Sequence, residues 1–322
     1  MVFIISNKLD PHCDVIIKKF HERNISFARF NAEDFPEKIT IFYEQSKKGQ
    51  KIVFSSDSFG DISLEQITSV WYRRPEQPNL ENVFEDKAVL DLALAEIKST
   101  LSGIWELMRN KLWVNHPVAN LVAGQKLNQL AIARNLGIKI PHTIVTNNIK
   151  RVLEFFNSHK EIIAKPISAG FVKRGEKISL IYTNKISKEI IFEKINLVKL
   201  TPTLFQEYIQ KQFELRITVV GNSLFACKID SQKSEKTQSD WRRYDFDNVP
   251  HSPFKLPSEI EKFCYSLLKT LNLSFGAIDM IVTPENDYVF LEINPNGQWG
   301  WIEKITGIPI SDSIVNLLVN GN

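Results

Sequence analysis

Three oxygen-bearing side chains near the C-terminal end have the types and spacing of a metal site. Asp279 lies in one apolar run, and Glu292 and Asn294 lie in the next. Both runs are rich in β-branched and aromatic residues and flank a short turn that contains proline, so the sequence predicts a β-hairpin. Side chains two residues apart share one face of a strand, which places Glu292 beside Asn294 and turns Leu291 and Ile293 towards the core.

An oxygen-only donor set of this kind suits a hard cation. Mg²⁺ commonly takes one or two carboxylates and completes its coordination with water and substrate phosphates, so the hairpin is predicted to carry the metal of a nucleotide-phosphate site. The alternative is a hairpin whose polar side chains only face solvent. The position of Glu292, between an apolar run and an Asn-Pro-Asn-Gly turn, favours the metal site.

A lysine and a basic loop add a second indication of phosphate binding. Lys165 ends an Ile-Ile-Ala strand, where a partly buried ammonium group requires an anion. Residues 168–175 nearly fit the P-loop spacing, but Glu176 stands in place of the essential lysine, which excludes that motif. A phosphate-covering lid and an ordinary hairpin loop both remain open for this segment.

A further strand pair is predicted around a Gly-Asn turn at residues 221–222. Glu214 and Arg216 share one face of its first strand, as a cross-strand ion pair or as site residues. The polar run over residues 231–240 is predicted to be a mobile loop.

The N-terminal part reads as a βαβ unit without the glycine-rich fingerprint of a dinucleotide site. A strand ends at Arg73 and Arg74, which are either surface arginines or anion contacts at a sheet edge. The helix predicted over residues 84–110 has an apolar stripe, including Val89 and Leu92, that is expected in the core.

Breaks near residues 115 and 200 divide the chain into three units. We predict an α/β N-terminal domain over residues 1–115, a small α+β unit over 116–200, and a C-terminal unit with an antiparallel sheet and the metal site over 201–322.

Composition narrows the function classes. The chain has 322 residues, 43% of them hydrophobic, with 40 Lys+Arg against 37 Asp+Glu. This near balance does not indicate wholesale nucleic-acid or membrane binding. Three dispersed cysteines argue against a cysteine zinc site and fit a reducing compartment. We find neither a signal peptide nor a segment of transmembrane length, so a cytoplasmic location is expected.

The ordered set of candidate residues resembles the ATP-grasp ligases. The residues that carry this resemblance are Lys126, Lys165, Gln206, Glu207, Tyr208, Ile209, Glu214, Arg216, Asp279, Glu292 and Asn294. Within that superfamily, residues 70–75 and 291–299 resemble the microviridin-type graspetide synthetases, which include the grasp-with-spasm group.

The resemblance covers essentially the whole chain and implies an ATP-grasp fold with an N-terminal pre-ATP-grasp domain. It implies that Lys126 and Lys165 contact the phosphates of ATP and that Glu214 contacts the ribose. The segment from Gln206 through Glu207 and Tyr208 to Ile209 would hold the adenine. The metal set would be Asp279, Glu292 and Asn294 with Mg²⁺. Some ligases of the superfamily carry arginine where this chain has Ala277. The resemblance therefore implies that Arg216 and Lys228 neutralise the charge of the phosphate or acyl phosphate.

The implied reaction activates an Asp or Glu side chain of a ribosomal precursor peptide as an acyl phosphate, which Ser, Thr or Lys then captures as a macrocyclic ester or amide. Trp71, Arg73 and Arg74 would lie on the peptide side. A homodimer is left open. The alternatives are an amino-acid or glutamyl ligase with the same fold, and a non-catalytic ATP-binding protein, against which the complete metal set argues.

Overall fold

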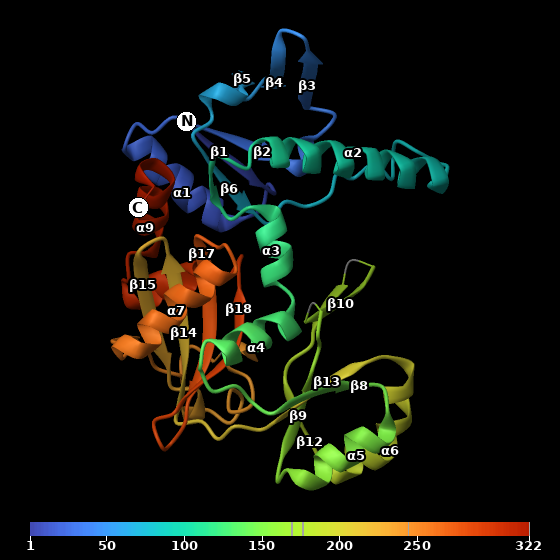
Figure 1. The fold of residues 1–322 in the computed structure, drawn as a ribbon, viewed down its shortest axis with the longest axis vertical. Helices are drawn as coiled ribbons and strands as arrows, with labels where there is room; N and C mark the ends of the chain where they lie inside the picture. The colour runs from blue at the N-terminus through green and yellow to red at the C-terminus, as the bar shows by residue number, and fades with distance from the viewer. Residues whose placement is uncertain (169, 176, 244, 322) are drawn as a thin grey trace.

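The computed structural model describes the whole chain except residues 169, 176, 244 and 322, together with the side chains of residues 173 and 178. Its elements form three units (Figure 1), and the helices α3 (Pro117–Ala123) and α4 (Lys126–Asn135) lead from the first unit to the other two. Each unit is built on its own β-sheet.

The first unit is a parallel sheet in the order β2-β1-β6-β7. Its strand β1 is buried along its whole length, which explains its continuous apolar sequence. The elements are β1 (Val2–Ser6), α1 (Pro11–Glu22), β2 (Phe27–Asn31), β6 (Ser69–Arg73), α2 (Lys87–Leu107) and β7 (Leu112–Val114).

A three-stranded antiparallel sheet extends from the first unit and consists of β3 (Ile39–Ser46), β4 (Gly49–Ser56) and β5 (Gly60–Ser63). Helix α2 projects sideways beneath it (Figure 1). The prediction that the whole apolar stripe of this helix is core is wrong, because Val89 and Leu92 are 44% and 62% exposed. Only its C-terminal turns, with Ile104 and Trp105, pack against the parallel sheet.

The central unit is an antiparallel sheet in the order β12-β9-β13-β8 with two helices packed on it. Its elements are β8 (Thr143–Thr146), α5 (Ile149–Ser158), β9 (Ile162–Lys165), β12 (Asn184–Ile186), α6 (Lys188–Lys194) and β13 (Thr203–Glu207). The basic segment after Lys165 forms strand β10 (Phe171–Arg174), which pairs with β11 (Lys177–Leu180) as a separate hairpin. Glu176, which argued against a P-loop, lies outside the described residues.

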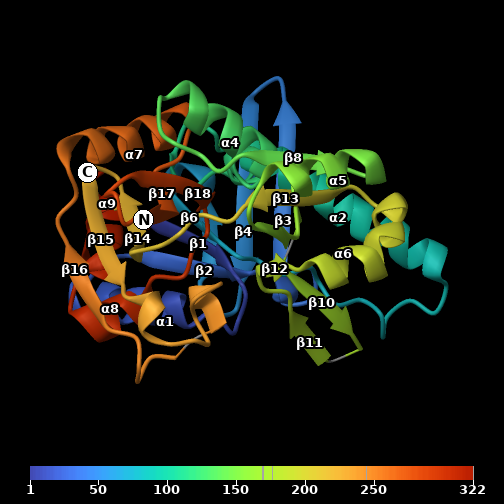
Figure 2. The ribbon, with the colours of Figure 1, turned by 90° about the horizontal axis from the view of Figure 1, so that it is seen from below.

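The third unit is an antiparallel sheet in the order β16-β15-β14-β17-β18, one face of which is covered by α4 and α7 (Figure 2). The elements are β14 (Phe213–Val220), β15 (Ser223–Ile229), β16 (His251–Phe254), α7 (Ser258–Thr270), β17 (Phe275–Val282), β18 (Tyr288–Asn294), α8 (Gly300–Thr306) and α9 (Ile310–Asn320). Helix α9 packs beside α1 and so connects the third unit to the first.

The polar segment over residues 231–240 does not extend into solvent as expected from its composition. Ser231, Thr237 and Asp240 are buried, and the hydroxyl of Thr237 donates to the carbonyl oxygens of Ser231 and Ser234. Internal hydrogen bonds therefore fold the segment against the end of β14. Among the described residues, no helix combines the length and apolar character that crossing a membrane requires.

Candidate functional site

The two predicted metal carboxylates face each other across the β17–β18 hairpin. Asp279 is the register partner of Glu292, whereas the next pair along is Met280 with Phe290. Leu291 is therefore an extra residue, a β-bulge that re-aims the strand beside the site. The expectation that Leu291 faces the core is wrong for this reason: it lines the same cavity as the two carboxylates.

Arg216 lies on β14 directly beside Asp279, its register partner. Its Nη1 atom donates to both carboxylate oxygens, at 2.9 and 2.8 Å. The pair is buried, and burial raises the pKa of Asp279 above its ordinary value despite the charge of Arg216. Arg216 Nε has no hydrogen-bond partner in the protein, so the guanidinium retains a free donor.

Glu292 is surrounded by cations from three different segments. The Nζ atom of Lys126 lies 3.4 Å from Oε2, and Nη1 of Arg242 lies 3.9 Å from Oε1. Although burial opposes ionisation, the charges of Lys126, Lys165 and Arg242 lower the pKa of Glu292. Glu292 is therefore held as a carboxylate.

Lys165 at the end of β9 lies in the same cavity as predicted. Burial, reinforced by the neighbouring charges of Lys126 and Arg242, lowers its pKa to about 8, although Glu292 acts in the opposite direction. An ammonium group whose pKa is depressed in this way is stabilised by an arriving anion. This favours the predicted phosphate contact.

The other end of the cavity is formed by the segment from Gln206 to Ile209 together with Glu214, whose contacts with adenine and ribose remain a prediction. Glu214 Oε1 accepts a hydrogen bond from Lys211 at 2.9 Å, whereas its buried Oε2 has no partner. Buried oxygens without partners are rare in folded proteins unless a ligand or water completes them. The free Oε2 is therefore available to hydroxyl groups such as those of a ribose.

Tyr208 forms part of this end as well. The Nζ atom of Lys185 lies 3.6 Å from the centroid of its ring, and Glu207 accepts a hydrogen bond from the backbone N–H of His142. Side-chain contacts thus fix the Glu207–Ile209 segment while its pocket-facing edge borders the cavity.

In this structure the cavity is narrow, with a volume of about 90 Å³. Pockets for ligands of nucleotide size usually measure roughly 300–1,000 Å³. The walls of the cavity come from both the central and the C-terminal unit.

Several residues of the cavity wall were not among the predicted site residues, including Lys211, Asp240, Trp241 and Arg242. Arg242 donates to both oxygens of Asp240, at 2.9 and 2.6 Å, and this contact raises the pKa of the guanidinium. The sequence signal for these residues was the Trp-Arg-Arg run that directly follows the polar segment 231–240. It was not used, because that segment was expected to be a mobile loop.

Lys228 does not join the site. Its register partner is Leu215, so its side chain lies on the opposite face of the sheet from Arg216. There it pairs with Asp230 at 2.8 Å and contacts the ring of Phe213. The structure thus separates Lys228 from the carboxylate pair that Arg216 contacts.

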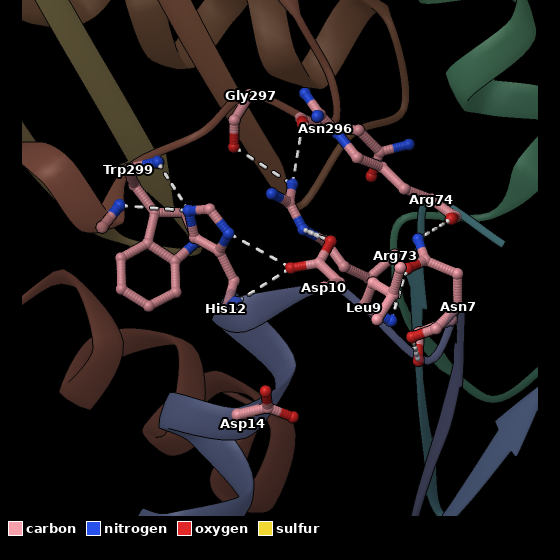
Figure 3. A network of polar contacts seen from close by, with 12 residues as sticks. Asn7, Leu9, Asp10, His12, Asp14, Arg73, Arg74, Asn296, Gly297 and Trp299 are labelled. Carbon is pink, nitrogen blue, oxygen red and sulfur yellow. Dashed lines mark hydrogen bonds and ion pairs between the residues drawn. The ribbon is translucent and has the colours of Figure 1, made fainter. Parts of the chain in front are cut away.

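Arg73 is neither a surface arginine nor an anion contact at an open edge. It is 2% exposed, and its Nη1 donates to the carbonyl oxygens of Asn296 and Gly297, which follow β18 (Figure 3). Arg74 Nε also donates to Asn296, and Trp71 is buried in the core. The predicted peptide-side residues therefore connect the first unit to the third.

Asn294 is exposed, and its Oδ1 accepts the backbone N–H of Asn296. Together with Glu292 and Arg242 it lines a second, open cleft that continues outward from the cavity. The carboxylate pair thus lies between the narrow closed cavity and the open cleft.

Comparison with known proteins agrees with this arrangement. Residues 1–120 match the MvdD pre-ATP grasp domain, and residues 123–318 match the RimK-like ATP-grasp domain. A Chryseobacterium gregarium ATP-grasp ligase associated with ribosomally synthesised, modified peptides (RiPPs) is 31% identical, with a TM-score of 0.91 over 100% of this chain and 97% of the other. The chain belongs to the RiPP-associated ATP-grasp ligases.

The ligase is also similar to the macrocyclase MdnC from Microcystis aeruginosa, with 28% identity, a TM-score of 0.86 and 99% of both chains covered. The ligase PsnB, at 19% identity and a TM-score of 0.80, shares the fold. No curated protein matches the sequence. The predicted ATP-grasp fold and the predicted resemblance are confirmed.

The donor set of the ligase fits Mg²⁺. Among the described residues, no group of three or more His, Cys, Asp or Glu side chains is placed to hold a metal ion. Asp279 and Glu292 provide two carboxylates on adjacent strands, and Mg²⁺ typically uses one or two and retains water or phosphate oxygens.

Proposed function

We propose that this ligase uses ATP and Mg²⁺ to activate Asp or Glu side chains of a ribosomal precursor peptide as acyl phosphates. A Ser or Thr hydroxyl, or a Lys amine, of the same peptide then forms a macrocyclic ester or amide. The observation that carries the proposal is one cavity in which Lys126, Lys165 and Arg242 surround Glu292 opposite Asp279.

The closed end is assigned to the nucleotide. Glu214 Oε2 would accept from the ribose, and the Glu207–Ile209 backbone would border the adenine. Lys126 and Lys165 would contact the phosphates as point charges. These contacts align the terminal phosphate with the carboxylate pair, and positioning accounts for much of phosphoryl-transfer catalysis.

Asp279, Glu292 and Asn294 would hold Mg²⁺, which supplies charge neutralisation on phosphate oxygens. Arg216 contacts Asp279, and Nη1 of Arg242 lies 3.9 Å from Oε1 of Glu292. A peptide carboxylate oxygen attacks the terminal phosphorus, ADP leaves, and an acyl phosphate forms. The hydroxyl or amine then attacks the acyl carbon, releasing inorganic phosphate and a proton.

The bound peptides of two relatives support a peptide substrate. The Chryseobacterium enzyme is in complex with ADP and with a leader and a core peptide, and MdnC is bound to the precursor peptide MdnA. The open cleft at Asn294 offers the route by which an acidic core residue would reach Arg242.

An apolar groove of about 980 Å³ provides room for the rest of the precursor. It lies on the other side of Lys126 and Lys165, between the start of α4 and the central sheet, and includes Leu127 and Ile181. Phe171 on the adjacent β10–β11 hairpin is 49% exposed. A free amino acid needs no such surface, so we assign it to the leader. The free buried cysteines fit a cytoplasmic location.

The test is incubation with ATP, Mg²⁺ and a short peptide rich in Thr or Ser and Asp or Glu, to be sought among the open reading frames that neighbour the gene. We expect the loss of one water mass and the release of one ADP for each ring, and capture of the intermediate by hydroxylamine. Formation of AMP, modification of free amino acids alone, or ADP release without any mass change in the peptide would overturn the proposal.

A further inference from the structure

We propose that Gln129 is a positioning residue that sets the direction of the metal-binding strand β18. The inference rests on the proposed function in one respect, the assignment of Glu292 and Asn294 as Mg²⁺ ligands. Gln129 touches neither carboxylate, and its effect would pass through the backbone of Ile293, which lies between Glu292 and Asn294.

The side-chain amide of Gln129 makes a two-point contact with that backbone. Its Nε2 donates to Ile293 O at 2.9 Å, and its Oε1 accepts from Ile293 N at 3.0 Å. Nε2 also donates to Ala123 O. Gln129 is 2% exposed, so each of its polar atoms is committed inside the protein.

The contact acts where β18 is least constrained. β18 is the edge strand of its sheet, and the bulge at Leu291 interrupts its pairing with β17 next to Glu292. On the outer edge, Phe290 N donates to Lys139 O at 2.9 Å before the bulge. Gln129 provides the corresponding contact after the bulge, so the strand is held on both sides of Glu292.

Helix α4 delivers two contacts from one face. Lys126 lies three residues before Gln129, a spacing that places both side chains on the same side of a helix. Lys126 Nζ approaches the Glu292 carboxylate, while Gln129 binds the following peptide group. The helix thus fixes both the charge and the backbone orientation of Glu292.

This arrangement predicts a specific loss. A bulged edge strand without its outer partner can twist, which would move Glu292 and Asn294 relative to Asp279. Nucleotide contacts on β13 and β14 would be unaffected. The affinity gained from Mg²⁺ should fall, whereas the metal-free affinity for ADP should not.

We would measure ADP binding to the full chain by calorimetry, with Mg²⁺ and with EDTA, in wild type and in Gln129→Met. Methionine keeps the length and shape of the side chain but neither hydrogen bond. The expected result is that the Mg²⁺-dependent gain in ADP affinity drops by about tenfold or more, the range seen when an outer-shell partner is lost. ADP affinity in EDTA should stay within about twofold of wild type.

Leu130→Ala is the matched control. Leu130 is the neighbouring buried residue of α4 and packs into the apolar core. It should lower the melting temperature and leave the Mg²⁺-dependent gain unchanged. If Gln129→Met does not fold, Gln129→Glu takes its place, because it keeps an acceptor for Ile293 N and loses the amide donor.

Two outcomes would overturn the inference in distinguishable ways. If wild type gains from Mg²⁺ and the Gln129 variants gain equally, Gln129 is only structural and the metal assignment stands. If wild type gains nothing from Mg²⁺, the metal site of the proposed function fails, and the role of Gln129 fails with it.

Discussion

Asp279 and Glu292 are adjacent carboxylates whose environments drive their pKa values apart. Burial raises the pKa of Asp279, which depends on Arg216 for compensation, whereas three cations lower the pKa of Glu292. The neighbouring cations therefore favour the ionised form of Glu292 even without a metal. Binding of a dication would favour ionisation of Asp279 and release Arg216 towards the transferring phosphoryl group.

Replacing Glu292 by glutamine should abolish turnover without unfolding the protein. The change removes an anionic ligand and leaves Lys126 and Arg242 without their counter-charge. We expect ADP release to fall by about 10²-fold or more, as for other single electrostatic contacts at a reacting centre. The measurement is ADP release at saturating Mg²⁺ with a melting curve alongside. Wild-type turnover in this variant would refute the metal assignment.

Lys165 should make ATP binding sensitive to alkaline pH. Its pKa of about 8 means that it is charged below pH 8 and neutral above, while the phosphates of bound ATP would keep it charged. Binding above pH 8 therefore requires proton uptake. The dissociation constant of ATP should rise by up to about tenfold per pH unit above pH 8. Calorimetry between pH 7 and 9.5 measures it.

Lys165→Arg is the control, because arginine remains charged throughout this range and should flatten the profile. In the protein without ATP, the folding stability changes with pH in the opposite direction to the ATP affinity. A lysine whose pKa is lowered from 10.5 to about 8 binds fewer protons when folded, so its contribution to stability increases as pH rises through that window. An unchanged profile in the arginine variant would assign the pH dependence to another group.

At the scale of elements, alternation and turn chemistry were sufficient to predict the hairpin to which we assign the metal site. The β-branched runs and the turn between them specify β17 and β18. The pairing of Asp279 with Glu292 does not follow from the turn, because the register that starts at Val282 and Tyr288 would oppose Asp279 to Leu291 without the bulge. The shared face of Glu214 and Arg216 on β14 was predictable from alternation.

The bulge at Leu291 was not predictable, because one extra residue in a strand leaves no compositional mark. Segment 231–240 misled for a different reason. Its polar side chains form hydrogen bonds with one another and with the backbone inside the fold. A polar composition alone does not distinguish such a segment from one exposed to solvent. The exposed part of α2 shows the opposite error. An apolar stripe indicates that a helix face can be buried, but it does not show that another element covers that face.

The apolar groove beside the β10–β11 hairpin should determine affinity for the precursor. Leu127 is 51% exposed and lines this groove. Leu127→Glu should raise KM for the full precursor by about tenfold, since burying an unpaired carboxylate is costly, and should leave kcat and ATP binding nearly unchanged. Steady-state kinetics with varied peptide concentration measures the effect.

Leu92→Glu is the matched control for that change. Leu92 is also an exposed leucine on a helix, at 62%, but α2 does not border this groove. Equal effects of the two variants would show that the precursor docks elsewhere.

At the scale of the whole molecule, the first unit reaches the site through a buried polar network (Figure 3). His12 Nε2 accepts the backbone N–H groups of Trp299 and Gly300, and its Nδ1 lies 3.1 Å from Asp10. Asp10 also pairs with Arg73. The network fixes the segment that directly follows β18.

The acid–base chemistry of this network is set by burial. Burial, together with the charges of Arg73 and Arg74, lowers the pKa of His12, although Asp10 opposes the change. The hydrogen bond from His12 and the charge of Arg73 outweigh the burial of Asp10 and lower its pKa to about 2. At neutral pH the pair is therefore a carboxylate beside a neutral imidazole whose free nitrogen is an acceptor.

Protonation of His12 would aim a new N–H at the two N–H groups it now accepts, so the folded state should resist it. Because the folded pKa lies below the unfolded value of 6.5, the contribution of His12 to stability is present above pH 6.5 and is lost as pH falls through that value towards the folded pKa. The maximum slope is about 1.4 kcal/mol per pH unit. His12→Gln keeps an acceptor that does not titrate. As the pH is lowered, the urea-unfolding free energy of this variant should therefore fall less steeply than that of the wild type, by up to this slope.

His116 and His251, whose pKa values are also lowered, are present in both proteins and cancel in the comparison. Parallel pH profiles for the two proteins would mean that the first unit does not depend on a neutral His12 to hold the site.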